Sequence, residues 1–411
     1  MMKKIEREQQ TSLRYLFFTF LKIGAISWGG FMALVSVVQK QLVEKDKKVS
    51  DEVILDSISL ASVLPGPLAF MVVSYLGYFL RGLKGALVSM IAILLPSFFL
   101  IMVLTYVYFV YGQLPAFTNF FKGVLPAVAA IIISVAVNMT QKNIKDYPQI
   151  VILIFSGLGL IFFHSFYTTA IIMAGGGISG YLFYRRSIKA GPETKKSKPD
   201  FTAKGIVTST IVIGTIILFV WFLPNIFGGE YEKKASLIKD ISFTFSGMSL
   251  TLFGGGYVII PAIQEIVVNG LNWLTTKEFA DAIAMGQITP GPIFISATFI
   301  GYKVAGLAGA VAATLSIFFP PAFLMIFCSH FLDRIKNSKT ISAIFKGLRP
   351  AVIGMIFSAA FTIGKGIEIH WISIFIFVAV LVSAIKFKVN VVYLIPVSGI
   401  VGMLLFYFFP A

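Results

Sequence analysis

The chain has 411 residues, of which 57% are hydrophobic and 13% are charged, and its formal net charge is +16. This composition excludes an ordinary soluble domain, and apolar runs along nearly the whole chain predict an all-α polytopic membrane protein. The basic residues lie mostly in short loops, so they indicate membrane topology and argue against nucleic-acid binding. A single cysteine, Cys328, excludes an intrachain disulfide and a multi-cysteine metal site. We expect neither a metal nor a cofactor.

The first half begins with an apolar segment at residues 13–38 that is interrupted at Gly29-Gly30, and a charged loop at 39–52 follows. Two short apolar pieces, 53–64 and 68–80, then flank Pro65-Gly66-Pro67. Each piece has only about two-thirds of the ~20 residues that a full span needs. The pair therefore forms either one kinked crossing or a re-entrant hairpin. Full-length spans are expected at 85–111, 123–139, 148–163 and 167–184.

The second half repeats the first. Trp28-Gly29-Gly30 aligns with Phe253-Gly254-Gly255 at an offset of 225 (253 − 28), and the two Pro-Gly-Pro motifs give the same value (290 − 65). Farther along, Pro126 aligns with Pro350 at an offset of 224 (350 − 126). A register kept over this distance predicts a tandem duplication. We expect a first repeat at 1–184, a basic cytoplasmic linker at 185–204, a joining transmembrane helix at 205–232 and a second repeat at 233–411.

The joining helix makes the number of segments between equivalent positions odd, so we expect the two repeats to have inverted topology, with about six helical segments each. The lysines and arginines of the 185–204 linker indicate that it is cytoplasmic. The basic loops on either side then predict a cytoplasmic N-terminus and a periplasmic C-terminus in the inner membrane of a bacterium.

The two Pro-Gly-Pro breaks form the candidate site. Proline ends a helix that arrives from Asp281 near Thr289, and Pro292 suits the first turn of a new helix. Inside a membrane, such a break is tolerated only where protein or a polar cavity satisfies the backbone. The free amide groups at the start of each new helix, around Leu68 and Ile293, favour an anion. Two such starts meeting near the middle of the membrane would bind an oxyanion; alternatively, Pro-Gly-Pro is only a packing kink.

Several side chains could help to bind the anion. Gln287, Thr289 and Ser296 could donate hydrogen bonds to an oxyanion, and Lys22 could either attract an anion or extend to the membrane surface. The candidate anion site also includes the backbone breaks themselves, at Gly29, Gly30, Pro65, Gly66, Pro67, Leu68, Gly254, Gly255, Gly256, Pro290, Gly291, Pro292 and Ile293.

Asp56 and Asp281 occupy equivalent positions in the two repeats. Each lies near the start of a short helix, where a carboxylate is favoured by the helix dipole. The alternative is that one or both carry a proton or another coupling ion.

Taken together, these motifs resemble those of the chromate ion transporter family in its long-chain, two-domain form. The resemblance rests on the segments 20–24 through Gly29-Gly30, 253–257 and 287–292, on Gly301-Tyr302 followed by Gly306 and Gly309, and on 345–352. It implies a carrier of chromate, with sulfate as a second candidate, that uses the proton-motive force and works outward. The first half departs from the family pattern: Trp28 replaces the usual Phe, and Ser62 stands where Gln is common. These changes weaken the case for chromate itself relative to divalent oxyanions in general.

Two other functions remain open from the sequence, an anion channel of the same architecture and a membrane protein that acts on phosphorylated lipids. The chain contains no metalloprotease motif, P-loop or nucleophile elbow, so we do not expect an enzyme. The expected partners are a small oxyanion and the lipid bilayer, and a homodimer is left open.

Overall fold

The computed structural model describes residues 11–27, 31–112, 114–163, 168–186, 230–251, 257, 259–330 and 338–409. Within these ranges the chain forms helices and connecting segments without strands, which confirms the all-α prediction. Five of the described helices are long and apolar enough to cross a membrane. Of the expected joining helix at 205–232, residues 205–229 lie outside the described ranges. The glycines of the two glycine breaks also lie outside them: Gly29, Gly30, Gly254, Gly255 and Gly256.

The order of elements repeats along the chain. The first series is α1 (Leu13–Ile26), α2 (Phe31–Gln39), the π-helix η1 (Lys40–Lys45), α3 (Asp51–Ala61), α4 (Leu68–Tyr111), α5 (Pro115–Asn143), α6 (Tyr147–Phe162) and α7 (Thr168–Tyr184). The second is α9 (Glu230–Thr251), α10 (Ile259–Ile263), the π-helix η3 (Gln264–Gly270), α11 (Thr276–Ile288), the 3-10 turn η4 (Ile293–Ile295), α12 (Ser296–Ser329), α14 (Lys339–Lys365), α15 (Trp371–Ile385) and α16 (Val391–Phe408). Helix α11 begins 225 residues after α3 (276 − 51), and α14 begins 224 residues after α5 (339 − 115).

The long helices α4 and α12 each contain a sharp reversal at equivalent positions. Gly82 has φ 61° and ψ −156°, and Gly306 has φ 65° and ψ −151°. This region of backbone space is accessible almost only to glycine. After the reversal the chain runs back along itself, because the hydroxyl groups of Thr298 and Thr314 lie 2.7 Å apart although they are 16 positions apart in sequence. Each Pro-Gly-Pro is thus followed by a short helix that packs against the long one.

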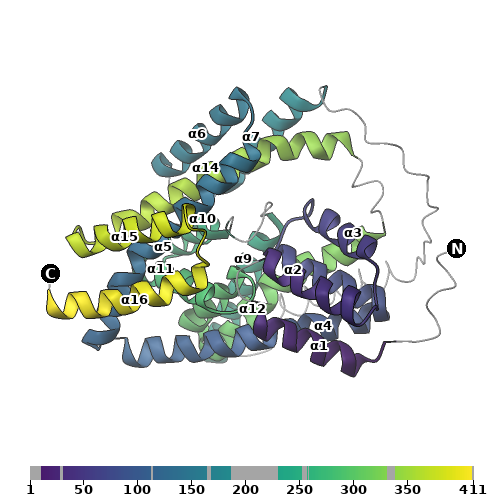
Figure 1. The fold of residues 1–411 in the computed structure, drawn as a ribbon, viewed down its shortest axis with the longest axis horizontal. Helices are drawn as coiled ribbons and strands as arrows, with labels where there is room; N and C mark the ends of the chain where they lie inside the picture. Colours follow the sequence, from purple (N-terminus) through teal and green to yellow (C-terminus); the bar gives the residue numbers. More distant parts are fainter. Residues whose placement is uncertain are drawn as a thin grey trace, which may run out of the picture.

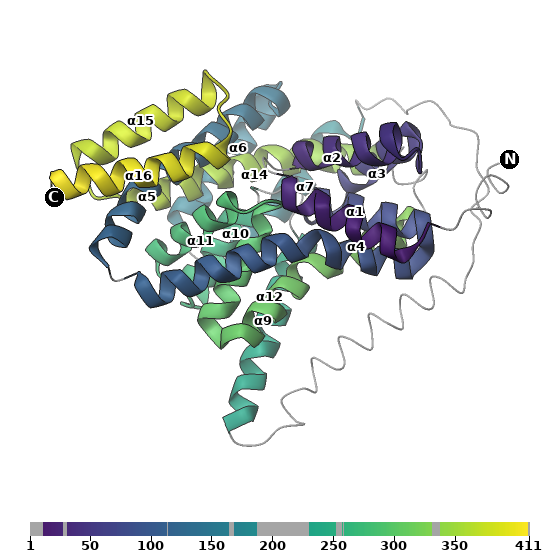
Figure 2. The same cartoon turned by 60° about the horizontal axis from the view of Figure 1, so that its bottom comes forward.

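The two series interlock. Helix α5 packs on α15 and α16, whereas α14 packs on α6 and α7, so the last two helices of each series lie against the other series (Figures 1 and 2). At both crossings glycines face each other, Gly123 on Gly402 and Gly180 on Gly347, which lets the helix backbones approach closely. Helices α4 and α12 also pack on each other. This arrangement holds the two Pro-Gly-Pro segments in one shared core.

Candidate functional site

The second Pro-Gly-Pro interrupts the helix as predicted, with one difference at its end. Helix α11 ends at Ile288, and Thr289 is extended, with φ −82° and ψ 150°. Pro292 was expected in the first turn of the next helix, but its backbone is extended (φ −77°, ψ 141°), so it is the N-cap. Pro67 has the same position before α4. Because proline has no capping side chain, the first amide groups of both helices lack a side-chain cap.

Each Pro-Gly-Pro docks on the opposite series. The Ser97 hydroxyl donates to the carbonyl oxygen of Pro290, and a side chain at Gly66 would overlap Pro321. Ser97 and Pro321 are equivalent positions (321 − 97 = 224), so the two contacts are repeats of each other. Gly66 and Gly291 have φ values of 118° and 93°, which an L-residue rarely adopts. These glycines therefore set the shape of both breaks.

A third contact involves Ser27, which follows the end of α1. The Gly291 amide donates to the carbonyl oxygen of Ser27 at 3.0 Å, and Ser27 directly precedes Trp28-Gly29-Gly30. The end of α1 therefore lies beside the second Pro-Gly-Pro.

A cavity of about 170 Å³ lies between the two breaks. This is room for a small inorganic ion with some water, since a water molecule takes about 30 Å³ of liquid volume. None of the described side chains that line it is charged. The lining consists of Pro67, Leu68, Ala69, Tyr257, Gly286, Gln287, Thr289, Gly291, Pro292, Ile293, Phe294, Asn390, Val391 and Val392.

Gln287 is the distinctive side chain of this cavity. It is only 8% exposed, and neither its amide nitrogen nor its amide oxygen has a hydrogen-bond partner among the described residues. A buried polar group without a partner typically destabilises a protein by about 1–3 kcal/mol. The Gln287 amide is therefore available to a ligand, next to the uncapped starts of α4 and of η4 with α12.

Of the predicted site residues, seven line the cavity: Pro67, Leu68, Gln287, Thr289, Gly291, Pro292 and Ile293. Pro65, Gly66 and Pro290 are buried in the same two segments but are not part of the lining. Ser296 is buried, and its hydroxyl donates to the Ile293 carbonyl oxygen at 2.9 Å. Lys22 lies on the exposed face of α1, outside the lining, and Asp56 is half-buried on α3.

Outside the two Pro-Gly-Pro segments, the lining includes residues that were not predicted as part of the site: Tyr257, Asn390, and Val391 and Val392 in the first turn of α16. Tyr257 follows directly after the Gly254 to Gly256 break, so that break was a usable signal. Asn390 had no such signal. Its place beside the cavity depends on the packing of α16 against α5 and α11.

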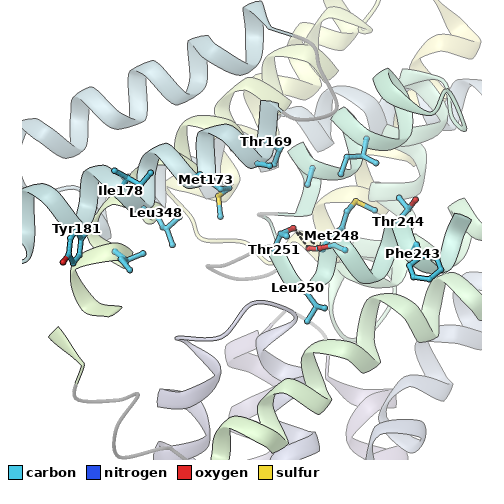
Figure 3. Close-up of a pocket in the computed structure, with 17 residues that line it drawn as sticks. Thr169, Met173, Ile178, Tyr181, Phe243, Thr244, Met248, Leu250, Thr251 and Leu348 are labelled. Atoms are coloured by element: carbon cyan, nitrogen blue, oxygen red, sulfur yellow. Dashed lines mark hydrogen bonds between the residues drawn. The ribbon is translucent and has the colours of Figure 1, made fainter. Parts of the chain in front are cut away.

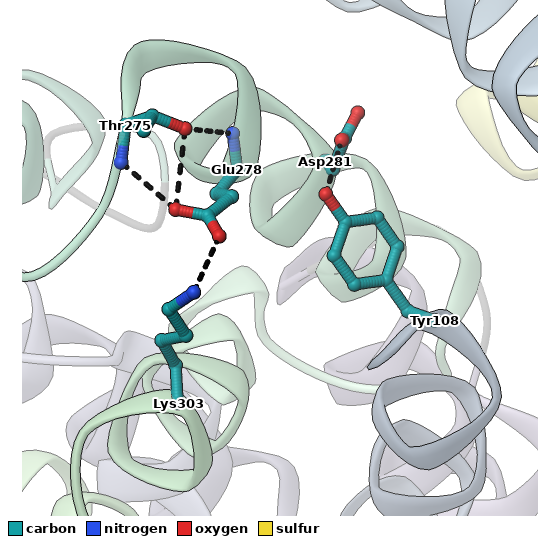
Figure 4. A network of polar contacts seen from close by, with 5 residues as sticks. All are labelled: Tyr108, Thr275, Glu278, Asp281 and Lys303. Carbon is teal, nitrogen blue, oxygen red and sulfur yellow. Dashed lines mark hydrogen bonds and ion pairs between the residues drawn. The ribbon is translucent and has the colours of Figure 1, made fainter. Parts of the chain in front are cut away.

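Asp281, on α11 of the second series, is buried and contacts Tyr108, on α4 of the first series (Figure 4). It is 1% exposed, its Oδ2 accepts a hydrogen bond from the Tyr108 hydroxyl at 2.8 Å, and its Oδ1 has no partner in the described part of the chain. The helix-start role considered for Asp281 belongs to Glu278. Glu278 forms a capping box with Thr275 and an ion pair with Lys303 at 2.7 Å. The sequence carried a usable signal for this distinction, because Thr275-Thr276-Lys277-Glu278 has the Thr-x-x-Glu spacing of a capping box.

A larger hollow of about 790 Å³ lies between α7, α9 and α14 (Figure 3). Its walls are mainly apolar, with Met173, Ile178, Phe243, Leu250 and Leu348 among them, and no charged side chain lines it in the described ranges. An apolar wall does not compensate an ion for its lost hydration. The smaller cavity is therefore the better candidate for the predicted anion site.

The sequence model of the chromate transporter family matches residues 14–181 and 239–403, which make up most of the chain. The chain belongs to the chromate transporter family. This confirms the family that the motifs indicated, and with it the prediction of a multi-pass membrane transporter rather than an enzyme. Family membership supports transport of chromate-like ions.

The similar proteins align with most of this chain and over most of their own length. The probable chromate transport protein of Synechococcus elongatus is 30% identical over 86% of this chain and 85% of its own length. The chromate transport protein of Cupriavidus metallidurans is 28% identical over 86% and 83%, respectively. An uncharacterized transporter of Methanocaldococcus jannaschii is 29% identical over 98% and 96%. No solved structure gives a significant match to this chromate transporter family member.

Proposed function

We propose that this protein is a secondary active transporter that exports a divalent tetrahedral oxyanion across a bacterial plasma membrane. Chromate is the first candidate, and sulfate, which has the same charge and shape, is the second. The observation that carries the proposal is the cavity between the two Pro-Gly-Pro breaks, where two uncapped helix starts meet the unpartnered amide of Gln287. Two relatives that cover most of the chain are named as chromate transport proteins, one of them as probable.

Backbone dipoles would supply most of the positive potential. A helix N-terminus is equivalent to about half a positive charge, so the starts of α4 and α12 together offer about one. Gln287 adds a directed amide donor. Thr289 currently donates its hydroxyl to the Gly286 carbonyl oxygen at 2.8 Å, so it would contact an anion only after that bond is exchanged. Binding without a lysine or arginine suits a carrier, because the anion must also leave.

Alternating access is the proposed transport mechanism. The cavity is built from elements of both series, so movement of one series against the other would open it first to one side and then to the other. The equivalent docking positions at Ser97 and Pro321 support this, since inverted repeats can exchange their conformations.

For coupling, we propose that Asp281 carries the proton. Its hydrogen bond to Tyr108 joins α11 to α4, so movement of the two series would change the surroundings of the carboxyl group. The nearest charged groups on its own helix are Lys277 and Glu278. Asp56 remains a second candidate at the equivalent position.

The test is uptake of labelled chromate into proteoliposomes that contain the purified protein and an imposed pH gradient. We expect saturable uptake that sulfate inhibits and that collapse of the gradient abolishes. Gly291→Ala should reduce uptake, because its φ of 93° cannot be kept without strain. Absence of chromate and sulfate uptake would refute the transporter proposal, and unitary current steps in planar bilayers would identify a channel instead.

A further inference from the structure

The anion site has a third wall, which belongs to a helix far from either Pro-Gly-Pro in sequence. We infer that Asn390 and the first turn of α16 form the mouth of the cavity, and that Asn390 contacts the oxyanion as it enters and leaves. This inference rests on the proposed function and assigns a role to residues that no motif identified.

The first observation is geometric. Asn390, Val391 and Val392 line the same cavity as the starts of α4 and η4. Asn390 is the N-cap of α16, and its Oδ1 accepts a hydrogen bond from the Val392 amide at 3.1 Å. Because a backbone N–H can only donate, the side-chain atom that faces it must be the oxygen. The cap therefore leaves the NH₂ group of Asn390 unused by α16 and able to donate to an anion.

The second observation is independent and comes from the deeper end of the cavity. Gln287 is more than nine-tenths buried and has an unpartnered amide in the same lining. Asn390, by contrast, is exposed. One carboxamide thus lies at the mouth and another inside, which is a path for an acceptor-rich ligand such as a tetrahedral oxyanion.

The chain just before Asn390 is basic. Lys386 and Lys388 are both exposed in the short connection between α15 and α16. Lys388 has a positive φ of 52°, and the Val389 amide donates to the Ser383 carbonyl oxygen at 3.1 Å, so this connection is a defined turn. Positive charge at the mouth of a cleft raises the local concentration of anions and their association rate. The lysines attract the anion, and Asn390 provides the first directed contact.

The decisive variant is Asn390→Asp, assayed for chromate uptake in proteoliposomes. Asp is as good an N-cap as Asn, so α16 should keep its stability. The variant replaces a donor by a negative charge at the mouth, and we expect KM for chromate to rise at least about tenfold with an unchanged unfolding temperature. Asn390→Ser also keeps a capping oxygen but removes the NH₂ donor, and its KM should rise by a smaller factor.

The matched control is Ser338→Asp. Ser338 caps α14 by accepting a hydrogen bond from Ile341, and it does not line the cavity, so this variant adds the same charge to a helix cap elsewhere. Its KM should equal that of the wild type. The double variant Lys386→Gln, Lys388→Gln should raise KM at low ionic strength and lose this effect at high ionic strength.

A wild-type KM in both Asn390 variants would overturn the inference. If Gln287→Leu still weakened uptake, the proposed anion site would stand and only the mouth would be wrong. If neither residue affected uptake, the proposed site would fail together with the inference.

Discussion

Replacement of Gln287 by leucine should have opposite effects on stability and on binding. The side chain is 8% exposed and its amide has no partner among the described residues, so leucine removes an unsatisfied polar group at nearly constant volume. Relief of such a group contributes about 1–3 kcal/mol, which predicts an unfolding temperature equal to or above that of the wild type. Loss of a hydrogen bond to a charged ligand should weaken binding by about 1.5–3 kcal/mol, which is a rise in KM of roughly 10- to 150-fold.

The control is Gln149→Leu. Gln149 is similarly buried, at 5% exposed, but its amide oxygen accepts from the Lys145 amide at 2.8 Å and its amide nitrogen donates to the Lys346 carbonyl oxygen at 3.4 Å. This variant should lose stability, by about 0.5–1.5 kcal/mol for each hydrogen bond, and should keep its KM. Unfolding in detergent can be followed with a thiol-reactive dye, because Cys328 is the single cysteine and is partly buried. KM is measured by labelled chromate uptake into proteoliposomes.

The reasoning would be refuted if Gln287→Leu lost stability to the same degree as Gln149→Leu and kept a wild-type KM. That result would mean that Gln287 has a protein partner in the folded state. Its amide would then not be available to an anion.

Three further predictions concern the kinks, the coupling and the outer face of α1. Gly82→Ala should destabilise the protein by about 1–3 kcal/mol, because Gly82 has a φ of 61° and a ψ of −156°. The control is Gly175→Ala, which also has open space for a methyl group but lies within the regular helix α7, and it should be neutral or slightly stabilising. Thermal unfolding of the two variants tests this difference. Asp281→Asn can still accept a hydrogen bond but cannot carry a proton, so exchange of internal for external chromate should persist while stimulation by a pH gradient is lost; gradient-driven uptake at the wild-type rate would exclude Asp281 as the carrier. Lys22→Gln should leave KM for chromate unchanged, because Lys22 is exposed and does not line the cavity. A rise in KM of about tenfold or more would show that Lys22 contributes to anion binding.

Much of the fold could be predicted because membrane segments obey strong local rules. The C-terminal end of α11 and the starts of α4 and η4 follow from proline chemistry, and the breaks fall at the predicted motifs. The reversal at Gly82 lies between the predicted segments 68–80 and 85–111. The one-residue shift of Pro292 from the first turn to the N-cap reflects its extended ψ, which composition does not reveal.

The candidate site could be predicted only in part. Gln287 and the Pro-Gly-Pro residues line the cavity, but Lys22 does not, because the orientation of an α1 side chain depends on how α1 packs on α4. Asp281 gained its partner from Tyr108, 173 positions away in the sequence. Contacts of this range depend on the assembled core rather than on local preference.

The sequence by itself determined the membrane setting, the repeated order of segments and the two helix breaks, because hydrophobicity, a constant register and the missing amide of proline can all be read along the chain. Tertiary structure alone decided that the two breaks face one cavity, that the first turn of α16 lines it, and that the last helices of each series pack on the other. The physical reason is that the meeting of two helix starts is set by interhelical packing, such as glycine on glycine at Gly123 with Gly402, and not by the residues at the starts themselves.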